Sequence, residues 1–357
     1  MDQLLKEAES RLASDLHLTV GVPAIVRLYG DLVPLETPVL SPVDTAGLAR
    51  QVLSEDHQKI FEEKGEVDFA YSIAGVGRFR VNVYRQRGST GVAIRVLNSE
   101  IPKVDELGLP GVVAKLTEAQ NGLILVTGPT GSGKSTTLAA MIGLINQERK
   151  CHILTLEDPI EYLHQHGQSM INQREIGADS SSFSVALRAA LRQDPDVVLV
   201  GEMRDLETIS IAITAAETGH LVLSTLHTVD APQTIDRVID VFPPHQQQQI
   251  RVQLANTLVG VIAQRLLKRR DEKGRVPAVE VLVANPAVRN LIREGKIHQI
   301  YSIIQTGSRH GMQLMDESLR RLYEQGLIDY DTAVGHAIDP ENLARLLGRA
   351  PARAGRL

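Results

Sequence analysis

The chain has 357 residues, which is room for two or three domains. Hydrophobic residues make up 43% of it and charged residues 23%, so disorder throughout is excluded. The longest apolar runs, such as 197–200, are far shorter than the ~18 residues of a membrane-spanning helix. We see no basic start followed by an apolar stretch, and the single cysteine, Cys151, excludes an intramolecular disulfide and a cysteine-based zinc cage. We therefore expect a cytoplasmic protein.

The charge balance argues against nucleic acid as a direct partner. There are 38 Lys and Arg residues against 43 Asp and Glu residues, a formal net charge of −5. Counterion release from basic surfaces dominates affinity for nucleic acids, and aromatic side chains supply stacking platforms. With 3% aromatic residues and no Trp, this chain is poor in both features.

Residues 1–100 are predicted to form a small α+β domain. Apolar residues at helical spacing indicate a helix over 2–13, and alternating apolar residues indicate strands over 67–73, 78–83 and 92–96. Short polar turns between such strands are typical of an antiparallel sheet with one wet face. Arg80 and Arg95 lie on the faces opposite the apolar residues, either in solvent or as arginine fingers that reach a nucleotide in another domain or subunit.

The pattern changes at residues 101–112, where two prolines and several charges predict an interdomain linker. Beyond it, residues 113–340 are predicted to form an α/β domain with a buried parallel sheet, because short strands that are apolar on both faces alternate with helices. From about Pro243 the chain is expected to be mostly helical. Residues 341–357 are predicted to be a disordered tail. The apolar strands on which the predicted parallel sheet depends are 123–127, 152–156, 197–200 and 221–224.

A glycine-rich segment follows the first of these strands and precedes a helical stripe. It fits the pattern G-x-x-x-x-G-K-[ST] at every fixed position. Its glycines let successive N–H groups surround phosphate oxygens, and the next helix adds its positive end. Lys134 is expected to reach the β- and γ-phosphates, and the Ser135 hydroxyl is expected to bind Mg²⁺. The segment consists of Gly128, Pro129, Thr130, Gly131, Ser132, Gly133, Lys134 and Ser135.

Polar residues end three other strands of the predicted sheet. Because ligands of open parallel sheets bind beyond the carboxyl ends of the strands, we expect these residues to share one site. Glu202 is expected on the strand next to the phosphate loop, where an acid helps to hold Mg²⁺, although Asp is commoner there. Glu161 or Glu157 could activate the attacking water, and His227 could sense the γ-phosphate. A single Glu of this kind is more simply explained as a helix cap or a surface residue, and the joint placement of all three clusters at strand ends beside the phosphate loop favours function.

In these motifs the sequence resembles the secretion superfamily of hexameric ATPases, and most of all the PilT family of type IV pilus retraction motors. Four segments carry the resemblance. They are the phosphate loop Gly128–Thr137, which adds Thr136 and Thr137; the acidic box Ile153–Glu161; the atypical Walker B stretch Asp194–Asp205; and the histidine box Gly219–Thr228. The resemblance extends from the first domain to about residue 335.

Two features favour the retraction branch. Assembly and type II secretion relatives usually carry a four-cysteine zinc insert, which one cysteine cannot form. Residues 287–294 match the retraction branch's Ala-Ile-Arg-Asn-Leu-Ile-type helix with one conservative change. Positions 288, 291 and 292 form its apolar stripe, and Arg289 and Arg293 are expected to face away from that stripe.

The resemblance implies a PAS-like first domain, a RecA-like second domain, and a homohexameric ring that hydrolyses ATP with Mg²⁺. It implies Lys134 on phosphate, Glu161 as general base, Glu202 near Mg²⁺, and His220 and His227 in sensing and coupling. It also implies a pilus platform protein of the inner membrane as partner, with the ring on the cytoplasmic face of that membrane at the pilus base. The alternatives are an accessory retraction, assembly or secretion ATPase, a RecA-like nucleic-acid translocase, and a nucleotide-gated scaffold.

Overall fold

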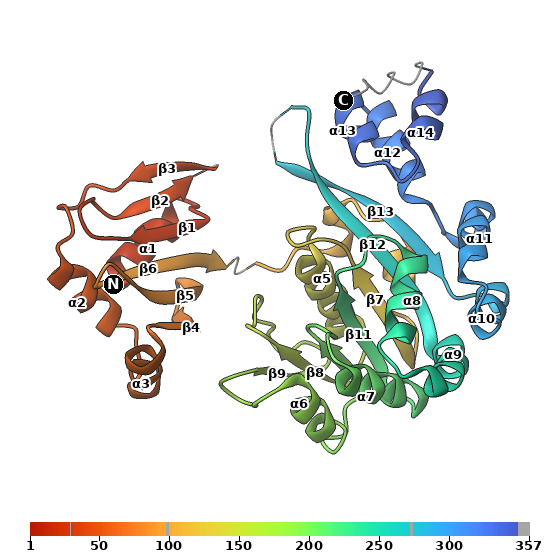
Figure 1. Cartoon of the computed structure of the whole chain (residues 1–357), viewed down its shortest axis with the longest axis horizontal. Coiled ribbons are helices and arrows are strands. Elements are labelled where there is room, and N and C mark those ends of the chain that lie inside the picture. Colours follow the sequence, from red (N-terminus) through yellow and green to blue (C-terminus); the bar gives the residue numbers. More distant parts are fainter. Residues whose placement is uncertain (29, 98–99, 272–273, 349–357) are drawn as a thin grey trace. The chain divides into compact units, whose positions relative to one another are not determined.

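The computed structural model describes residues 1–28, 30–97, 100–271 and 274–348. Contacts divide the chain into two compact units (Figure 1). The smaller unit comprises Met1–Glu100 together with Pro159–Leu163, and the larger unit comprises Ile101–Asp158 and the chain from His164 onward. Within the described residues, no helix combines the length and the apolar character needed to cross a bilayer.

The smaller unit is an antiparallel six-stranded sheet with the order β3-β2-β1-β6-β5-β4, accompanied by helices. Alternation along β5 buries Phe79, Val81 and Val83, which pack with Leu5 of α1. The predicted α+β fold of this part is confirmed. The first helix is shorter than expected, because it ends at Ser10 and Leu12 adopts a φ of 57°. The elements are α1 (Asp2–Ser10), β1 (Asp15–Leu18), β2 (Ile25–Leu28), β3 (Asp31–Pro34), α2 (Pro42–Arg50), α3 (Glu55–Lys64), β4 (Glu66–Ile73), β5 (Gly77–Gln86) and β6 (Ser89–Leu97).

The larger unit is built on a seven-stranded sheet with the order β13-β12-β7-β11-β10-β8-β9. Its strands run parallel except for β13, which pairs antiparallel with β12. The four predicted buried strands are all present, as β7 (Gly122–Thr127), β8 (His152–Glu157), β10 (Val197–Val200) and β11 (Leu221–Leu226), and β9 is Met170–Glu175.

Helices cover both faces of this sheet, which confirms the predicted three-layer α/β architecture. One apolar cluster joins the sheet to α7, α8 and α9, and another joins its other side chains to α4 and α5. The helices of this unit are α4 (Val112–Leu116), α5 (Lys134–Glu148), α6 (Phe183–Ala190), α7 (Leu206–Glu217), α8 (Ala231–Asp240), α9 (Pro244–Thr257), α10 (Pro286–Arg293), α11 (Ile300–Thr306), α12 (Met315–Glu324), α13 (Tyr330–Gly335) and α14 (Pro340–Leu346).

The expectation of a mostly helical chain after Pro243 is wrong for residues 258–268 and 275–283. There the long strands β12 (Leu258–Lys268) and β13 (Arg275–Val283) extend the sheet beyond β7. All four residues of β12 from Gly260 to Ala263 are buried, because the strand is covered on both faces like its parallel neighbours. Figure 1 shows the hairpin beside α12, where Leu267 and Val276 pack against Met315 and Leu319.

Two predicted boundaries also differ from the structure. Residues 101–112, expected as a linker, group with the larger unit, where Val104 lies in a 3₁₀ helix and is buried with Val113. The tail expected from residue 341 begins as helix α14, whose Leu343 is buried against α12 and β13 residues. Residues 349–357 of that expected tail lie outside the described residues.

Candidate active site

The phosphate loop joins β7 to α5, as the sequence predicts. Gly128, Gly131 and Gly133 adopt φ values of 140°, 78° and 87°, which side chains with a Cβ rarely tolerate. Pro129, Thr130 and Gly131 are exposed at the crest of the loop, whereas Ser132 is buried beneath it. A glycine-rich turn that opens directly into a helix presents N–H groups and the positive helix end to an anion.

Lys134 is the first residue of α5 and lies over this loop. Its Nζ donates hydrogen bonds to the carbonyl oxygens of Gly128 (2.9 Å) and Pro129 (3.1 Å). Ser135, next along the first turn, is exposed, and Thr136 is half-buried. The ammonium and the Ser135 hydroxyl therefore both lie at the end of α5 where the loop's N–H groups converge.

Glu202 and His227 come together beyond the carboxyl ends of β10 and β11. Glu202 Oε1 lies 2.9 Å from His227 Nε2 and also accepts a hydrogen bond from Arg204 Nε. Two bonds hold the strand ends: Ser224 Oγ donates to the carbonyl of Val200, and Thr225 Oγ1 donates to that of Gly201, each at 2.7 Å. These bonds hold the ends of β10 and β11 side by side, and so they position Glu202 and His227, which follow the two strands.

The strand order corrects one part of the prediction. Glu202 was expected on the strand next to the phosphate loop, but β11 lies between β7 and β10. The neighbouring strand end therefore carries His227, and Glu202 follows a strand roughly 10 Å from β7, at about 4.8 Å per strand. The side chain of Glu202 bridges part of that distance when it reaches His227.

The two candidate bases belong to different units. Glu157 ends β8 in the larger unit, where its Oε1 accepts hydrogen bonds from Thr155 Oγ1 (2.6 Å) and Gln173 Nε2 (3.2 Å). Glu161 lies in the segment 159–163, which groups with the smaller unit. There the carbonyl of Ile160 accepts a hydrogen bond from Arg78 Nε at 2.9 Å. The structure does not bring Glu161 and the phosphate loop together within one unit.

His220 does not join the other site residues of its unit. It immediately precedes β11, whereas His227 follows that strand, so the six residues of β11 separate them by roughly 20 Å. The carbonyl of His220 pairs with Gly122 N at the start of β7, and its Nδ1 lies 3.0 Å from the carbonyl of Ala215. Within one chain, His220 therefore lies at the sheet edge opposite the phosphate loop.

Arg80 and Arg95 both lie on the smaller unit, in direct cross-strand register on β5 and β6. Arg80 Nε lies 4.0 Å from Asp68 Oδ1, and Arg95 Nε lies 3.2 Å from Asp15 Oδ1. Both guanidinium groups are exposed, as the alternation of the strands predicts.

The helix predicted over 287–294 is α10. Val288 and Ile292 are buried and Leu291 is half-buried, which confirms the apolar stripe. Arg293 is exposed, but Arg289 turns back into the protein. Its guanidinium donates to the carbonyl oxygens of Ala255 (2.6 Å), Asn256 (2.5 Å) and Ala284 (3.1 Å).

Sequence reasoning missed two residues of the site. Arg204 binds Glu202 from two positions further along the chain, and its place inside the Walker B stretch was the only signal for it. Gln264, on β12, lies directly beneath the phosphate loop. No sequence pattern could have indicated Gln264, because 127 residues separate it from Thr137, its hydrogen-bond partner.

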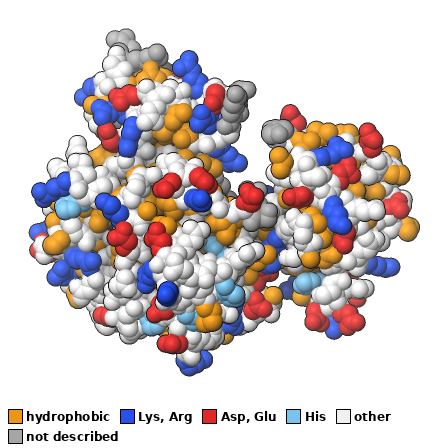
Figure 2. All heavy atoms as spheres, turned by 180° about the vertical axis from the view of Figure 1, so that it is seen from behind, with side chains coloured by type: hydrophobic (Ala, Val, Ile, Leu, Met, Phe, Trp, Pro, Cys, Tyr) orange, Lys and Arg blue, Asp and Glu red, His pale blue; other side chains and the backbone are white. Residues whose placement is uncertain are grey.

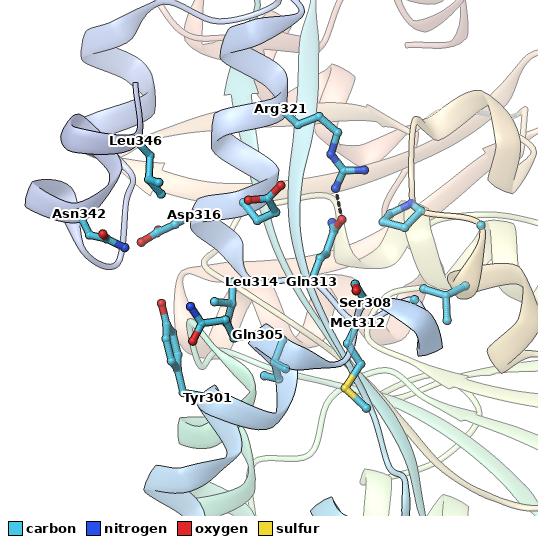
Figure 3. A pocket seen from close by; sticks show the side chains of 16 residues that line it. Tyr301, Gln305, Ser308, Met312, Gln313, Leu314, Asp316, Arg321, Asn342 and Leu346 are labelled. Atoms are coloured by element: carbon cyan, nitrogen blue, oxygen red, sulfur yellow. Dashed lines mark hydrogen bonds between the residues drawn. The ribbon is translucent and has the colours of Figure 1, made fainter. Parts of the chain in front are cut away.

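A cavity of about 480 Å³ lies elsewhere in the larger unit (Figure 3). Tyr301, Gln313, Asp316 and Asn342 contribute polar groups to its wall, and Figure 3 shows the hydrogen bond between Arg321 and Gln313 beside it. None of the predicted site residues lines this cavity. The candidate site is instead an open surface formed by the loop and the strand ends.

Comparison with known proteins gives concordant matches. The family described as "Type II/IV secretion system protein" matches residues 1–331. The type IV pilus retraction ATPase PilT of Pseudomonas aeruginosa is 48% identical over 340 residues, covering 95% of this chain and 98% of that protein. The type IV pilus ATPase PilU of the same organism is 41% identical over 346 residues, covering 97% of this chain and 90% of that protein. A crystal structure of the pilus retraction motor PilT with bound ADP superposes with a TM-score of 0.91 at 53% identity, covering 96% of this chain and 98% of that one.

Proposed function

The chain belongs to the type II/IV secretion protein family and is an ATPase of the PilT type, and from this premise we propose that it hydrolyses Mg²⁺–ATP in a ring of six subunits to retract type IV pili. The observation that carries the proposal is the placement of the phosphate loop at the end of β7, with the Glu202–His227 pair at the ends of neighbouring strands. This is the edge of a parallel sheet where ligands bind.

ATP is the substrate that these groups suit. The N–H groups of residues 128–133 and the Lys134 ammonium would hold the β- and γ-phosphates, because both donate to anionic oxygen. The bonds of Lys134 to two loop carbonyls keep its ammonium at the loop. His227, whose Nε2 is held by Glu202 at the end of the strand next to the loop, would lie against the γ-phosphate and so sense its presence.

Mg²⁺ fits the donor set that the larger unit offers here. Ser135 supplies a hydroxyl and Glu202 supplies a carboxylate, and Mg²⁺ is usually bound by one or two such oxygens together with waters and substrate phosphates. When bound, the ion would neutralise the charge that develops on the phosphoryl oxygens.

Water activation is assigned to Glu161, with Glu157 as the alternative. The Oε1 of Glu157 already accepts hydrogen bonds from Thr155 and Gln173, which fix that side chain to its own sheet. Glu161 belongs to the smaller unit, as do Arg80 and Arg95, the proposed arginine fingers. Hydrolysis would then require both units, and closure of one unit on the nucleotide held by another is how force would be generated.

The proposed partners are other copies of this chain and a pilus platform protein in the inner membrane, with the ring at the cytoplasmic side of the pilus base. Nucleic acid is not a proposed partner. Figure 2 shows acidic and basic side chains interspersed over the visible face of the larger unit, and acidic residues outnumber basic ones over the whole chain. An accessory role of the PilU type is the second candidate, favoured by 41% identity to that ATPase.

Calorimetric titration with Mg²⁺–ATP and a phosphate-release assay test the ATPase proposal. Lys134→Ala should abolish turnover, whereas the matched control Lys150→Ala, which removes an exposed cation beyond the other end of α5, should keep it. Normal turnover by Lys134→Ala would contradict the assignment of the loop. Restoration of twitching in a strain that lacks only its own retraction ATPase distinguishes the retraction motor from an accessory one.

A further inference from the structure

The phosphate loop rests on one buried amide. Gln264 is 3% exposed, and its Nε2 donates a 2.7 Å hydrogen bond to the carbonyl oxygen of Ser132. Its Oε1 accepts a 2.8 Å hydrogen bond from Thr137 Oγ1, in the first turn of α5. A single side chain on β12 thus ties together the loop and the helix that follows it.

The same residue also explains two of the loop's glycines. A Cβ at Gly128 would lie 2.2 Å from the backbone oxygen of Gln264, and a Cβ at Gly133 would lie 2.8 Å from its Nε2. Real Cβ atoms do not approach backbone so closely, so the loop packs on β12 only with glycine at position 128. At position 133 a Cβ would push the amide of Gln264 aside, and the φ of 87° disfavours any side chain there. The contact between loop and strand is therefore close at both ends of the loop, whereas its crest is exposed.

The bond to Ser132 fixes the direction of the next amide. In a trans peptide the C=O and the following N–H point in opposite directions. Because the Ser132 carbonyl is held toward Gln264, the Gly133 N–H points away from the protein interior, to the side on which a phosphate would bind. The orientation of the amide follows from its partners, because a carbonyl can only accept and Nε2 must therefore face Ser132. The hydroxyl of Thr137 then donates to Oε1 and holds the other end of the amide.

We propose that Gln264 is a positioning residue for nucleotide binding, which holds the Ser132–Gly133 peptide so that the Gly133 N–H faces the phosphates. The inference rests on the proposed function, because it assigns the substrate's phosphates to this loop. Gln264 is buried beneath the loop, on the side away from the proposed phosphate site. It acts through the loop backbone, and a peptide that lost this anchor could turn its carbonyl toward the phosphate instead.

Gln264→Met tests the proposal, since methionine has similar volume and makes neither hydrogen bond. We expect the Kd for Mg²⁺–ADP and the KM for ATP to rise about 10- to 100-fold. This is the usual range for losing a hydrogen bond to a charged group, here the bond from the Gly133 N–H to the phosphate. The kcat should change much less than KM. Thr137→Val should weaken binding through the same bond, so the double variant should be little worse than Gln264→Met alone.

Ser318→Ala is the matched control. Ser318 is also buried, and its Oγ accepts a hydrogen bond from Val279 N on β13. Val279 is paired with Gln264 across the hairpin, so this variant disturbs the same region but leaves both hydrogen bonds of Gln264 in place. This variant should melt earlier and bind ADP with wild-type affinity. Wild-type ADP affinity in Gln264→Met would overturn the proposal.

A second variant covers the case in which Gln264→Met fails to fold. Gln264→Asn keeps an amide but is shorter by one methylene, so it cannot span Ser132 and Thr137, and ADP affinity equal to wild type would again overturn the proposal. Failure of the wild-type chain to bind Mg²⁺–ADP would instead contradict the proposed function, so the two failures are distinguishable.

Discussion

Glu202 and His227 meet across the ends of two adjacent parallel strands, with Glu202 Oε1 2.9 Å from His227 Nε2. Burial raises the pKa of Glu202, but the hydrogen bonds and charges of Arg204 and His227 outweigh it, and the net pKa is lowered. The carboxylate therefore stays ionised, which suits a group that would face Mg²⁺ and its waters.

Arg204→Ala should shift the acidic limb of the pH–rate profile to higher pH. Arg204 is among the groups that lower the Glu202 pKa, so its removal raises that pKa, and the carboxylate then becomes protonated at a higher pH. Because the lowered pKa of Glu202 places the wild-type limb below 4.5, kcat/KM for ATP is measured from about pH 4 upward. Arg188→Ala is the control, because Arg188 pairs with a different acid, Glu207, and should leave the limb in place. An unmoved limb in Arg204→Ala would show that Glu202 does not limit the rate at low pH.

Glu161→Gln should bind ATP normally and slow hydrolysis by about 10²- to 10⁴-fold, the range for losing a general base. Glu157→Gln should have a smaller effect on turnover, because Oε1 of Glu157 already accepts hydrogen bonds from Thr155 and Gln173 within the sheet. Single-turnover hydrolysis with ATP binding measured in parallel separates the two steps. The reverse ranking of the two variants would assign the base to Glu157.

The sequence was sufficient for the parts of the fold that local pattern determines. The strands later seen as β7, β8, β10 and β11 were predicted because buried parallel strands are apolar on both faces, and the loop at 128–135 because its glycines and lysine have fixed spacing. The antiparallel strands β4, β5 and β6 followed from period-two alternation. Each of these signals lies within a dozen residues.

Features that depend on distant contacts could not be predicted. The strands β1, β2 and β3 have four residues each, too few to show a period. The order that inserts β11 between β7 and β10 has no local signature, and neither does the grouping of residues 159–163 with the smaller unit. Arg289 was expected to face away from the apolar stripe, and only the end of α9, more than 30 residues earlier, shows why it turns inward.

Arg80 and Arg95 should act on a nucleotide bound by a different subunit. Their direct pairing across β5 and β6 places two like charges together, which is unfavourable unless acids or an anion compensate, and Asp68 and Asp15 are the nearby acids. Rings of Arg80→Ala or Arg95→Ala chains should hydrolyse ATP slowly. Mixing them with Lys134→Ala chains should restore activity, because each defective chain supplies what its neighbour lacks.

The readout for these rings is ATPase activity against mixing ratio. Arg85→Ala, on the same strand but stacked over Phe61, is the control and should show neither loss nor restoration. Activity that is merely additive in the mixture would contradict a finger acting between subunits.

Arg289→Ala should lower the free energy of unfolding by about 1–3 kcal/mol, because it leaves carbonyls at the end of α9, among them that of the buried Ala255, without a partner. The carbonyls of Ala255 and Asn256 belong to the last turn of α9, where the helix itself offers no N–H to accept from. Arg293→Ala, on the exposed side of the same helix, should change it by no more than about 0.5 kcal/mol. Denaturant titration of the two variants gives the comparison, and equal effects would contradict the role of Arg289 at the end of α9.

Glu280→Gln should remove a pH dependence of stability. Glu280 is fully buried on β13, and its Oε1 accepts a hydrogen bond from Ala231 N at the start of α8. Its Oε2 has no hydrogen-bond partner among the described residues, so an amide nitrogen can replace it without meeting a donor. Burial, together with the charges of Asp230 and Asp316 and despite the bonds from Ala231 and Met315, raises the pKa of Glu280 to about 7.

A carboxyl with a raised pKa stabilises the fold while it is protonated, so this contribution is complete below about pH 4.5 and is lost as pH rises through 7. The free energy of unfolding of Glu280→Gln minus that of wild type should therefore rise as the pH is raised from 5 to 8.5. The rise should reach up to about 3 kcal/mol, at ~1.4 kcal/mol per pKa unit. Urea denaturation at the two pH values measures this. Glu317→Gln, an exposed acid on α12, should keep the wild-type dependence, because Glu280 is still present. A constant difference between Glu280→Gln and wild type across this range would show that Glu280 is ionised in the folded protein at both pH values.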